Sequence, residues 1–352
     1  MSYADGWAAL NLQMPPRVPR TEYSADCHWQ LVSAVTGVAV GPETPEAIRQ
    51  QASRAFVRAW NYDLLWSTAI AGSEFGDLRT DMGHAEYAAG GVDRRDTVHC
   101  PFTEPEQVLA FDPVAAYGRK HHAELVQRFE AHYEANCRAQ ADLVNMTGIY
   151  ISLVSGLIDI FGWEMLLLAA GTDPESFGRL ANRYSQWIQQ YFDALADSNV
   201  PVVMVHDDIV WTSGAFLAPD WYRAWVFPNY RRMFAPLREA GKKIIYTSDG
   251  NYSAFIDDIV ACGVHALVME PMTDMAYVAQ RYGRQIAFIG NADTRILLSG
   301  GRRQIHAEVQ RCMAIGKPCP GFFMAVGNHI PANTPVDSAL YYNEVYERLG
   351  RR

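Results

Sequence analysis

The second half of the chain repeats one unit, an apolar run followed by a segment with helical spacing, and this repeat restricts the fold more than any other feature. The apolar runs end in polar or charged residues, and several of the helical segments stop at a glycine, a common helix terminator. The runs cover residues 199–208, 242–251, 264–271, 285–293 and 321–331. Near-continuous apolar strands that alternate with helices indicate a parallel sheet covered on both faces.

The first half supplies three further strand candidates, at residues 16–26, 62–70 and 141–152. Together these segments allow about eight strand–helix units, which predicts an α/β fold of the (β/α)8 TIM barrel type. An open doubly wound sheet is the alternative, but no Gly-x-Gly-x-x-Gly follows an early strand, which argues against a dinucleotide-binding fold. We expect one domain over residues 1–352, with residues 1–60 as an N-terminal extension and first strand.

The expected helices follow from apolar spacing, from proline near the start and from glycine at the end. They are residues 173–196, 218–241, 252–263, 275–283, 301–316 and 336–350. The most apolar stretch, residues 149–171, contains Asp159 and Glu164. We therefore expect it to form a buried strand or loop and a helix, and not a membrane span.

Charge and cysteine usage exclude several classes of protein. The formal net charge is −9 without a basic block, so nucleic acid is not an expected partner. The six cysteines are scattered without a Cys-x-x-Cys pair, which argues against a disulfide framework and a thiolate zinc knuckle. The N-terminal segment lacks the pattern of a signal peptide, and we expect a cytoplasmic protein.

Polar groups collect where the five apolar runs end. They are His206-Asp207-Asp208, Asp249-Gly250-Asn251, Glu270-Pro271, Asn291-Ala292-Asp293 and Asn328-His329. Any one of these could be a turn or a helix cap. In a barrel, however, the carboxyl ends of all the strands share one rim, where catalytic residues lie. We therefore expect a site there.

The residue types at this rim suit a metal or proton transfer. Asp249, Glu270 and His329 offer two carboxylates and one imidazole, which is the layout of a catalytic zinc site with an open position. Zinc is one candidate among several, because the set is rich in oxygen. Asp293 and Asp208 could bind the metal or orient its ligands. Without a metal, the same carboxyl groups with raised pKa values beside a histidine would suit proton transfer.

The first half adds further candidates. Asp81, His84 and Tyr87 lie on a glycine-bearing segment, residues 79–91, and long irregular segments in compact domains are often functional. Tyr150 and Trp163 could form walls around a flat apolar substrate, although aromatic residues of this kind are more often plain core.

Several segments, in this order, resemble the uroporphyrinogen decarboxylase superfamily over residues 60–350. They read HDDIVWTSGAFLAPDWYRAWVFPNYRRMF, IIYTSDGN, GVHALVMEP, IGNADTRIL and GNHIPANTP. The resemblance implies a (β/α)8 barrel that is often dimeric. It also implies either a tetrapyrrole decarboxylase or a cobalamin-dependent methyltransferase.

The decarboxylases carry an arginine-rich segment after the first strand, because bidentate arginine–carboxylate pairs hold the acidic tetrapyrrole. The matching stretch here, TEYSADCHWQ at residues 21–30, is acidic and aromatic, with no arginine between Arg20 and Arg49. The segments RTDMGHAEY, MTGIYISL and FGWEMLL instead resemble the branch that demethylates aryl methyl ethers such as veratrol or vanillate. That branch transfers the methyl group to the cobalt of a separate corrinoid protein.

The resemblance leaves the ligand set open. Other methyltransferase branches use His-x-Cys and a later Cys as zinc ligands, and Thr247, Asp249 and His329 stand at those positions. The aryl-ether branch has a Glu-x14-Glu-x20-His pattern, which Asp293, Glu308 and His329 match with Asp in place of the first Glu. Glu308 lies in the middle of a predicted helix, away from the barrel mouth, so we expect it to be a structural partner. His329 belongs to both sets.

The sequence thus predicts methyl transfer from a methoxylated, aromatic substrate to a partner corrinoid protein. Zinc on His329, Glu270 and Asp249 or Asp293 would polarise the ether oxygen, and substitution of His329 should abolish both metal binding and turnover.

The candidates for proton delivery are Asp81, His84, His206 and Asp208. The candidates for substrate binding are Tyr87, Tyr150 and Trp163. The alternatives are a metal-independent decarboxylase of a tetrapyrrole or smaller acid, and a non-catalytic barrel that binds a tetrapyrrole or corrinoid. The chain lacks the Asp-x-His-x-x-Gly motif of corrinoid proteins, so cobalamin would be carried by the partner.

Overall fold

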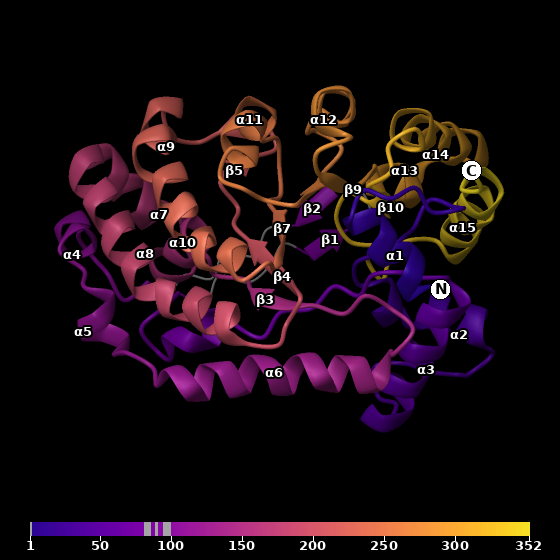
Figure 1. The fold of residues 1–352 in the computed structure, drawn as a ribbon, viewed down its shortest axis with the longest axis horizontal. Helices are drawn as coiled ribbons and strands as arrows, with labels where there is room; N and C mark the ends of the chain where they lie inside the picture. The colour runs from indigo at the N-terminus through magenta and orange to yellow at the C-terminus, as the bar shows by residue number, and fades with distance from the viewer. Residues whose placement is uncertain (1, 81–85, 89–90, 94–99) are drawn as a thin grey trace.

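A six-stranded parallel sheet forms the centre of the protein (Figure 1). The computed structural model describes residues 2–80, 86–88, 91–93 and 100–352, with only the backbone described for 86–88 and 91–93. The strand order is β10-β9-β8-β7-β4-β3, and neighbouring strands run parallel. The strands are β3 (Thr147–Ile149), β4 (Val202–His206), β7 (Lys243–Thr247), β8 (Ala266–Met269), β9 (Ala287–Ala292) and β10 (Phe322–Val326).

Two short extended segments near residues 17–23 and 62–66 join the edges of this sheet and close it. Arg20 forms a parallel bridge to Met324 in β10, and the Asp63 N–H donates to the Arg20 carbonyl at 2.9 Å. The Leu65 N–H donates to the Val144 carbonyl, just before β3, at 2.9 Å. These contacts supply two further strand positions, so the predicted (β/α)8 barrel is confirmed.

Helices surround the barrel. They are α1 (Tyr3–Leu10), α2 (Trp29–Thr36), α3 (Glu46–Ala59), α4 (Pro105–Leu109), α5 (Pro113–Tyr117), α6 (His122–Ala139), α7 (Val154–Thr172), α8 (Pro174–Asp197), α9 (Pro219–Trp225), α10 (Phe227–Glu239), α11 (Ile256–Val260), α12 (Met275–Tyr282), α13 (Thr294–Ser299), α14 (Arg302–Gly316) and α15 (Val336–Leu349). Short 3₁₀ helices lie at Ala25–Cys27, Gly72–Phe75 and Ser253–Phe255. Two hairpins pair β1 (Glu86–Ala88) with β2 (Gly91–Asp93), and β5 (Val210–Trp211) with β6 (Gly214–Ala215).

The helix signals in the sequence hold with two differences, and the first is that the helix expected over residues 252–263 consists of a 3₁₀ helix, Ser253–Phe255, and the short α11, Ile256–Val260. Asp173 caps α8, because its carboxylate accepts from the Ser176 N–H at 2.9 Å, and Pro174 follows at the first position, as predicted. The single helix expected over residues 218–241 is divided at Val226 into α9 and α10. Pro228 is the second residue of α10, and a proline lacks the N–H that a continuous helix would need there.

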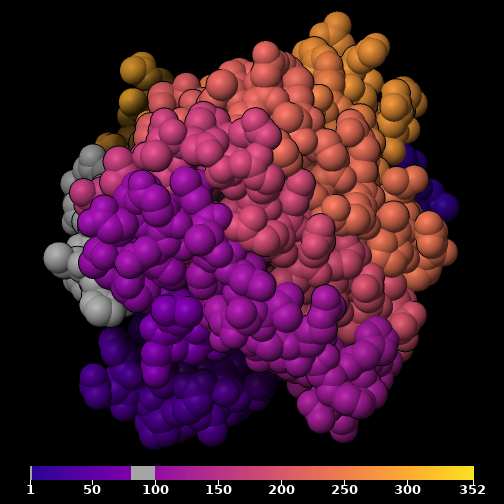
Figure 2. All heavy atoms as spheres, turned by 90° about the vertical axis from the view of Figure 1, so that its left-hand side faces the viewer, coloured from indigo at the N-terminus to yellow at the C-terminus, as the bar shows by residue number. Residues whose placement is uncertain are grey.

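Both ends of the described chain lie at the right of Figure 1, and residues 16–18 contact the C-terminal end of the chain. The Val18 N–H donates to the Gly350 carbonyl at 2.8 Å, and the Tyr346 hydroxyl donates to the Val18 carbonyl at 2.8 Å. The N-terminal segment is therefore fastened to α15. Figure 2 shows the side that is at the left of Figure 1, where magenta to orange atoms of the middle of the chain form most of the surface.

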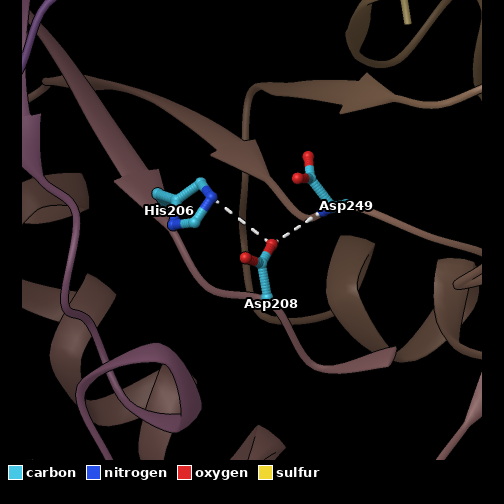
Figure 3. Close-up of side chains that lie close together, drawn as sticks. All are labelled: His206, Asp208 and Asp249. Carbon is cyan, nitrogen blue, oxygen red and sulfur yellow. Dashed lines mark hydrogen bonds and ion pairs between the residues drawn. The ribbon is translucent and has the colours of Figure 1, made fainter. Parts of the chain in front are cut away.

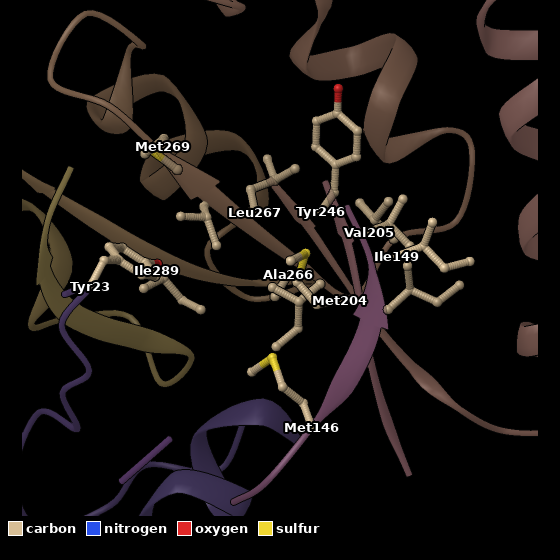
Figure 4. Packing of buried hydrophobic residues seen from close by; sticks show 14 of the residues in the cluster. Tyr23, Met146, Ile149, Met204, Val205, Tyr246, Ala266, Leu267, Met269 and Ile289 are labelled. Carbon is tan, nitrogen blue, oxygen red and sulfur yellow. The ribbon is translucent and has the colours of Figure 1, made fainter. Parts of the chain in front are cut away.

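Large apolar side chains fill the barrel and its helical layer (Figure 4). Every residue of β4, β8, β9 and β10 is buried, as expected for a parallel sheet covered on both faces. Met204, Tyr246 and Leu267 are each 0% exposed, and burial of one such side chain contributes roughly 1.5–3 kcal/mol.

One described helix, α7, is long and apolar enough to cross a membrane, yet 61% of its most apolar window is buried inside the protein. The chain bends at Gly162, whose φ of 69° is left-handed, a conformation that glycine adopts without strain. The stretch begins at the end of β3 and continues as a core helix, so the prediction of a buried strand or loop and a helix over residues 149–171 is confirmed.

Candidate functional site

A cavity of about 260 Å³ opens at the carboxyl ends of the barrel strands, the end at which catalytic residues lie in such barrels. Residues in both short extended segments and just after the first one, the residue after β3, and residues at or just beyond the ends of β4, β7, β8 and β10 line it. They are Glu22, Tyr23, Ser24, Asp26, Cys27, Tyr62, Leu65, Trp66, Tyr150, His206, Thr247, Asp249, Val268, Gly327, Asn328 and His329. The cavity is therefore built from residues far apart in sequence that the barrel brings to one rim.

Three of the predicted site residues gather beside this cavity (Figure 3). A ligand atom from each of His206, Asp208 and Asp249 lies within 4.8 Å of the other two. His206 ends β4, Asp208 follows two residues later, and Asp249 lies two residues beyond β7. His206 Nε2 is 3.3 Å from Asp208 Oδ1, which also accepts the Asp249 N–H at 2.8 Å.

The backbone at Tyr150 determines the tautomer of His206. His206 Nδ1 is 3.1 Å from the Tyr150 carbonyl oxygen, which can only accept, so Nδ1 carries the proton and Nε2 presents a lone pair. The two rings stack with centroids 3.8 Å apart. Burial lowers the pKa of His206, which favours the neutral ring. A histidine that binds a metal usually donates its other N–H to a carbonyl or carboxylate in this way.

The two carboxyl groups of the cluster hold their protons to unusually high pH. Burial is the main cause that raises the pKa of Asp208 to about 7, and the neighbouring Asp207 and Glu270 raise it further. Burial likewise raises the pKa of Asp249 well above its usual value, with further contributions from Asp208 and Glu270. Carboxyl groups with raised pKa values that surround a histidine in a cleft are typical of functional sites.

Asp207, between His206 and Asp208, has a structural role. One of its carboxylate oxygens accepts the Ser155 N–H at 2.6 Å, and the other accepts the Tyr230 hydroxyl. The Asp208 N–H donates to the Ser155 hydroxyl at 2.7 Å. These bonds attach the segment after β4 to α7 and fix the backbone of Asp208.

Glu270 lies next to the cluster but its carboxylate is engaged. One oxygen accepts the Gly250 N–H at 2.7 Å, and the other accepts the Asn328 side-chain amide at 2.6 Å. Glu270 thus ties the end of β8 to the loops after β7 and β10. Through the Gly250 N–H, it orients the segment that carries Asp249.

Asp293 and Glu308 lie together, at the end of β9 and on α14. The Asp293 carboxylate caps α13 and pairs with Arg295 at 2.7 Å. Its backbone N–H donates to Glu308 Oε1 at 2.9 Å, and Glu308 also pairs with Arg311 at 2.6 Å. The structure therefore does not bring Asp293 to the three-residue cluster, and it places Glu308 in the structural contact expected from its helical position.

His329 lines the cavity, as its place after β10 predicts. Its Nδ1 is 2.6 Å from the Ser24 hydroxyl, and its carbonyl accepts the Thr294 hydroxyl at 3.0 Å. His329 and Asp249 therefore share the cavity, although the metal-compatible group of described residues consists of His206, Asp208 and Asp249.

The other predicted residues fall in different places. Tyr150 lines the cavity. Trp163 instead packs against Trp211 and Phe216, with ring centroids at 5.6 and 5.0 Å. Asp81 and His84 lie outside the described residues, and Tyr87 belongs to β1, of which only the backbone is described.

Sequence reasoning missed several residues of the cavity wall: Glu22, Tyr23, Tyr62 and Trp66. The available signal was the acidic and aromatic character of residues 21–30. The sequence did not show that these residues form a cavity wall, because the extended segment at residues 17–23 pairs with its neighbours only through isolated bridges. Three hydroxyls of the wall are buried without a hydrogen-bond partner among the described residues: Tyr23 Oη, Tyr62 Oη and Thr247 Oγ1.

The nearby Arg20 does not reach the cavity. It is 0% exposed, pairs with Glu22 at 2.7 Å and hydrogen-bonds Asn343. Its guanidinium lies over Trp60 and Tyr346, with its carbon 4.7 and 4.4 Å from the ring centroids. In the part of the chain that the structure describes, no lysine or arginine lines the cavity.

The cluster fits a divalent cation. A neutral imidazole nitrogen and two carboxylates from adjacent strand ends form the nitrogen and oxygen donor set that Zn²⁺ and other first-row cations accept. Thr247 lines the same cavity, and its buried hydroxyl has no hydrogen-bond partner in the part of the chain that the structure describes. Without a cation, the same three groups can hold and move a proton.

Comparison with known proteins agrees with this architecture. The solved structure of a methyltransferase from Methanosarcina mazei superimposes with a TM-score of 0.62 at 16% identity, over 97% of this chain and 96% of the other. That likeness concerns the fold.

Curated relatives match one half of the chain. A uroporphyrinogen decarboxylase of Pelobacter propionicus is 22% identical over 178 residues, 51% of each chain. One of Idiomarina loihiensis is 28% identical over 181 residues, 50% of this chain and 49% of the relative. The chain thus spans about half the length of these curated relatives. The family model described as uroporphyrinogen decarboxylase (URO-D) matches residues 98–348, which is well over half of the chain, and the chain therefore belongs to the uroporphyrinogen decarboxylase family.

Proposed function

We propose that this protein is a methyltransferase that moves a methyl group from a methoxylated, aromatic small molecule to the cobalt of a partner corrinoid protein in the cytoplasm. The observation that carries the proposal is the small cavity at the barrel rim, where His206, Asp208 and Asp249 meet beside aromatic walls. The likeness of the fold to a methyltransferase from Methanosarcina mazei supports it.

The chemistry requires help at the ether oxygen. The O–CH3 bond breaks with both electrons left on oxygen, and Co(I) supplies the electron pair of the new Co–C bond. Because an aryloxide is a poor leaving group, positive charge or a proton near the oxygen lowers the barrier. Burial, and after it the neighbouring carboxyl groups, raise the pKa values of Asp208 and Asp249, so either can donate a proton to the departing oxygen.

In their deprotonated form the two aspartates, together with His206, would instead hold the cation that the family resemblance implies, with zinc as the first candidate. When bound there, the cation would supply a Lewis acid beside the ether oxygen. The protein contributes two hydrogen bonds: the Tyr150 carbonyl keeps His206 in its neutral tautomer, and the bond from the Gly250 N–H to Glu270 holds Asp249 in place.

The walls of the cavity would orient the ring. Tyr150 stacks on His206, and Trp66 stands nearly perpendicular to Tyr23 at 83°, with ring centroids 5.1 Å apart. Aromatic side chains in such an arrangement favour a flat apolar ligand. His329, which also lines the cavity, is a further candidate for metal binding or proton donation. Asp81 and His84 are candidates for the same roles. The homodimer stays a prediction.

The relatives named as uroporphyrinogen decarboxylases suggest a second function, decarboxylation of a tetrapyrrole. Two observations disfavour it. A volume of about 260 Å³ lies below the range of roughly 300–1,000 Å³ that drug-sized ligands occupy. The described lining also lacks the arginines that would pair with many carboxylates, which is the physical requirement for such a substrate.

The proposal is tested by supplying the purified protein with a reduced corrinoid protein and a panel of methoxyarenes, and by following methylation of the cobalt spectroscopically. We expect methylated corrinoid and the free phenol in equal amounts. Release of carbon dioxide from a carboxylic acid substrate, with no methylated corrinoid from any methoxyarene, would support the decarboxylase instead.

A further inference from the structure

A second cavity, of about 430 Å³, lies beside the cavity at the barrel rim, and residues of the first 3₁₀ helix, α2, α3 and the end of α6 form most of its wall. We propose that this second cavity binds a small organic anion, a carboxylate on a flat apolar body, through the guanidinium of Arg54. The site goes beyond the proposed function, because its lining contains none of His206, Asp208 and Asp249.

One face of α3 forms a wall of the second cavity. Its lining residues recur every three or four positions, the spacing of side chains on one face of a helix. They are Glu46, Arg49, Gln50, Ser53, Arg54 and Val57. The end of α6 lies beside α3 at the lower right of Figure 1 and adds Ala139 and Gln140. A volume of about 430 Å³ lies within the range of roughly 300–1,000 Å³ that is usual for small-molecule sites.

The lining of the second cavity differs in charge from that of the rim cavity. The two linings share Asp26, Cys27 and Leu65. The second cavity adds two arginines, Arg49 and Arg54. A ligand of the second cavity therefore meets positively charged side chains of the protein itself.

Hydrogen bonds hold the walls of the second cavity together. The Ser53 hydroxyl donates to the Asp26 carbonyl at 2.7 Å, which ties the first 3₁₀ helix to α3. The Gln140 side-chain amide donates to the Arg54 carbonyl at 3.4 Å, which ties the end of α6 to α3. A wall that is already held in place needs little rearrangement when a ligand binds, and this lowers the cost of binding.

The charge of Arg49 is compensated within the wall. Arg49 pairs with Glu46 at 2.5 Å, and Glu46 also accepts the Gln50 side-chain amide at 2.8 Å. The Arg49 guanidinium donates to the Pro42 carbonyl at 3.1 Å, and its carbon lies 5.8 Å from the centroid of the Trp29 ring. Arg49 thus supports the ring of Trp29 as a wall and leaves the recognition of an anion to Arg54.

Arg54 is the charged group that is available to a ligand. It is half-buried and lines the cavity, and its guanidinium makes no hydrogen bond or ion pair with the residues that the structure describes. A guanidinium stays charged at every accessible pH and binds a carboxylate through two parallel N–H···O bonds. The Asp26 carboxyl group opposes an anion less than an exposed carboxylate would, because burial raises its pKa.

The rest of the lining favours an apolar body on the anion. Trp29, Val57, Leu65 and Ala139 lie in the same lining as Arg54. Trp29, Leu65 and Ala139 are only half-buried, so they keep apolar surface that a ligand can cover. A carboxylate on a flat apolar body would use both the arginine and these side chains, whereas inorganic phosphate would use the arginine alone.

Calorimetry on the full chain, with chelator present, tests the class of ligand. Benzoate is the probe, benzamide has its shape without its charge, and acetate has the charge without the ring. We expect benzoate to bind, and benzamide and acetate each to bind at least about tenfold more weakly, which corresponds to about 1.4 kcal/mol. Absence of benzoate binding would overturn the proposal, and so would equal or tighter binding of benzamide, acetate or inorganic phosphate.

Variants of α3 test the role of Arg54. Arg54→Gln should weaken benzoate at least about tenfold and leave benzamide unchanged. Arg54→Lys keeps the charge without the two parallel donors and should give an intermediate loss. Arg58→Gln is the matched control, since Arg58 is exposed on the same helix and outside the lining; it should change neither ligand. If Arg54→Gln binds benzoate as tightly as the unsubstituted protein, the proposal is wrong.

Two further measurements locate the bound anion. Benzoate should change the fluorescence of Trp29, so the change should disappear in Trp29→Phe while calorimetry still detects binding. Asp208→Asn, in the cluster at the rim, should bind benzoate as the unsubstituted protein does. Loss of binding in Asp208→Asn with retention in Arg54→Gln would place the anion in the rim cavity and contradict the proposal.

Failure of this proposal can be distinguished from failure of the proposed function, because these binding measurements contain neither a corrinoid protein nor a methoxyarene. If benzoate binds as expected but no methoxyarene methylates the corrinoid, the second site stands and the proposed function fails. Methyl transfer without any binding of benzoate gives the reverse conclusion.

Discussion

At the residue scale, the two nitrogens of His206 have different partners, and this difference suits a ligand. Nδ1 is committed to the Tyr150 carbonyl, and Nε2 faces Asp208. A ring held in this way needs no reorientation to bind a cation. His329 differs, because its Nδ1 is hydrogen-bonded to the Ser24 hydroxyl, which also belongs to the cavity lining.

His206→Ala should therefore abolish stabilisation of the protein by Zn²⁺ or Co²⁺. In the unsubstituted protein, a cation at one hundred times its Kd should raise the free energy of unfolding by about 2.7 kcal/mol, measured as an increase in Tm. His329→Ala is the matched control, and it should keep most of the increase. The reverse result, loss with His329→Ala and retention with His206→Ala, would favour the ligand set of Asp249, Glu270 and His329 predicted from the sequence.

The carboxyl groups of the cluster predict a dependence on pH. Burial raises the pKa of Asp208 to about 7 in the folded protein, compared with about 3.9 when unfolded. The folded state thus binds the proton more tightly, so this contribution to stability is complete below about pH 4 and is lost as the pH rises through 7. Asp208→Asn should reduce the fall in unfolding free energy between pH 5 and 7 by up to about 1.4 kcal/mol per pH unit.

Urea titrations at several pH values, with chelator present, measure this slope. An identical slope in the variant would contradict the raised pKa. Added Zn²⁺ should have the opposite effect on the unsubstituted protein and stabilise it more as the pH rises, because only the deprotonated carboxyl groups bind a cation.

At the element scale, one glycine decides how the end of β7 presents Asp249. Gly250 has a φ of +81°, and a Cβ there would lie 2.7 Å from the carbonyl carbon and oxygen of Trp211 in β5. Its N–H also binds Glu270. The turn after β7 is thus packed against the β5–β6 hairpin, with no room for a side chain.

Gly250→Ala should lower the free energy of unfolding by about 2–4 kcal/mol, the sum of strain at positive φ and the backbone clash. It should also weaken cation binding, because Asp249 is the preceding residue. Gly241→Ala is the control, since its φ is +70° but its Cβ would meet nothing within 4 Å; it should cost only about 1–2 kcal/mol. Equal losses of stability in the two variants would show that the contact with Trp211 is unimportant.

At the scale of the whole molecule, the barrel is closed by a buried ion pair. Arg20 and Glu22 are on the first extended segment, next to β10. Glu22 accepts the Val326 N–H at 2.9 Å and the Tyr342 hydroxyl at 2.8 Å. The pair therefore connects the first strand position to the last strand and to α15.

Arg20→Met should destabilise the protein by about 3–5 kcal/mol, because it leaves Glu22 buried without a counter-charge. The double variant Arg20→Met, Glu22→Gln should recover part of this loss, since the uncompensated charge is gone. Chemical denaturation of both variants measures the difference. If the double variant is less stable than the single one, closure of the barrel depends on the hydrogen bonds of Glu22 and not on its charge.

Local signals determined the elements and their order. Apolar runs and glycine stops predicted β4, β7, β8, β9 and β10 with their helices, because strand and helix periodicity are properties of neighbouring residues. The same runs placed Asp249, His206 and Asp208 at strand ends, and parallel topology placed those ends on one rim. The short extended segments near residues 17–23 and 62–66 could be suggested only as strand candidates, because their pairing partners are distant in sequence.

The sequence alone determined that a (β/α)8 barrel would gather carboxyl and imidazole groups at one rim, because repeated local patterns specify the units and chirality specifies how they close. Only the tertiary structure decided which groups remain available. The Glu270 carboxylate accepts hydrogen bonds from Gly250 and Asn328, and the Asp293 carboxylate forms an ion pair with Arg295. His206, Asp208 and Asp249 instead converge on one another. The physical reason is that each polar group binds its nearest partner in space, and those partners come from loops whose positions no local pattern encodes.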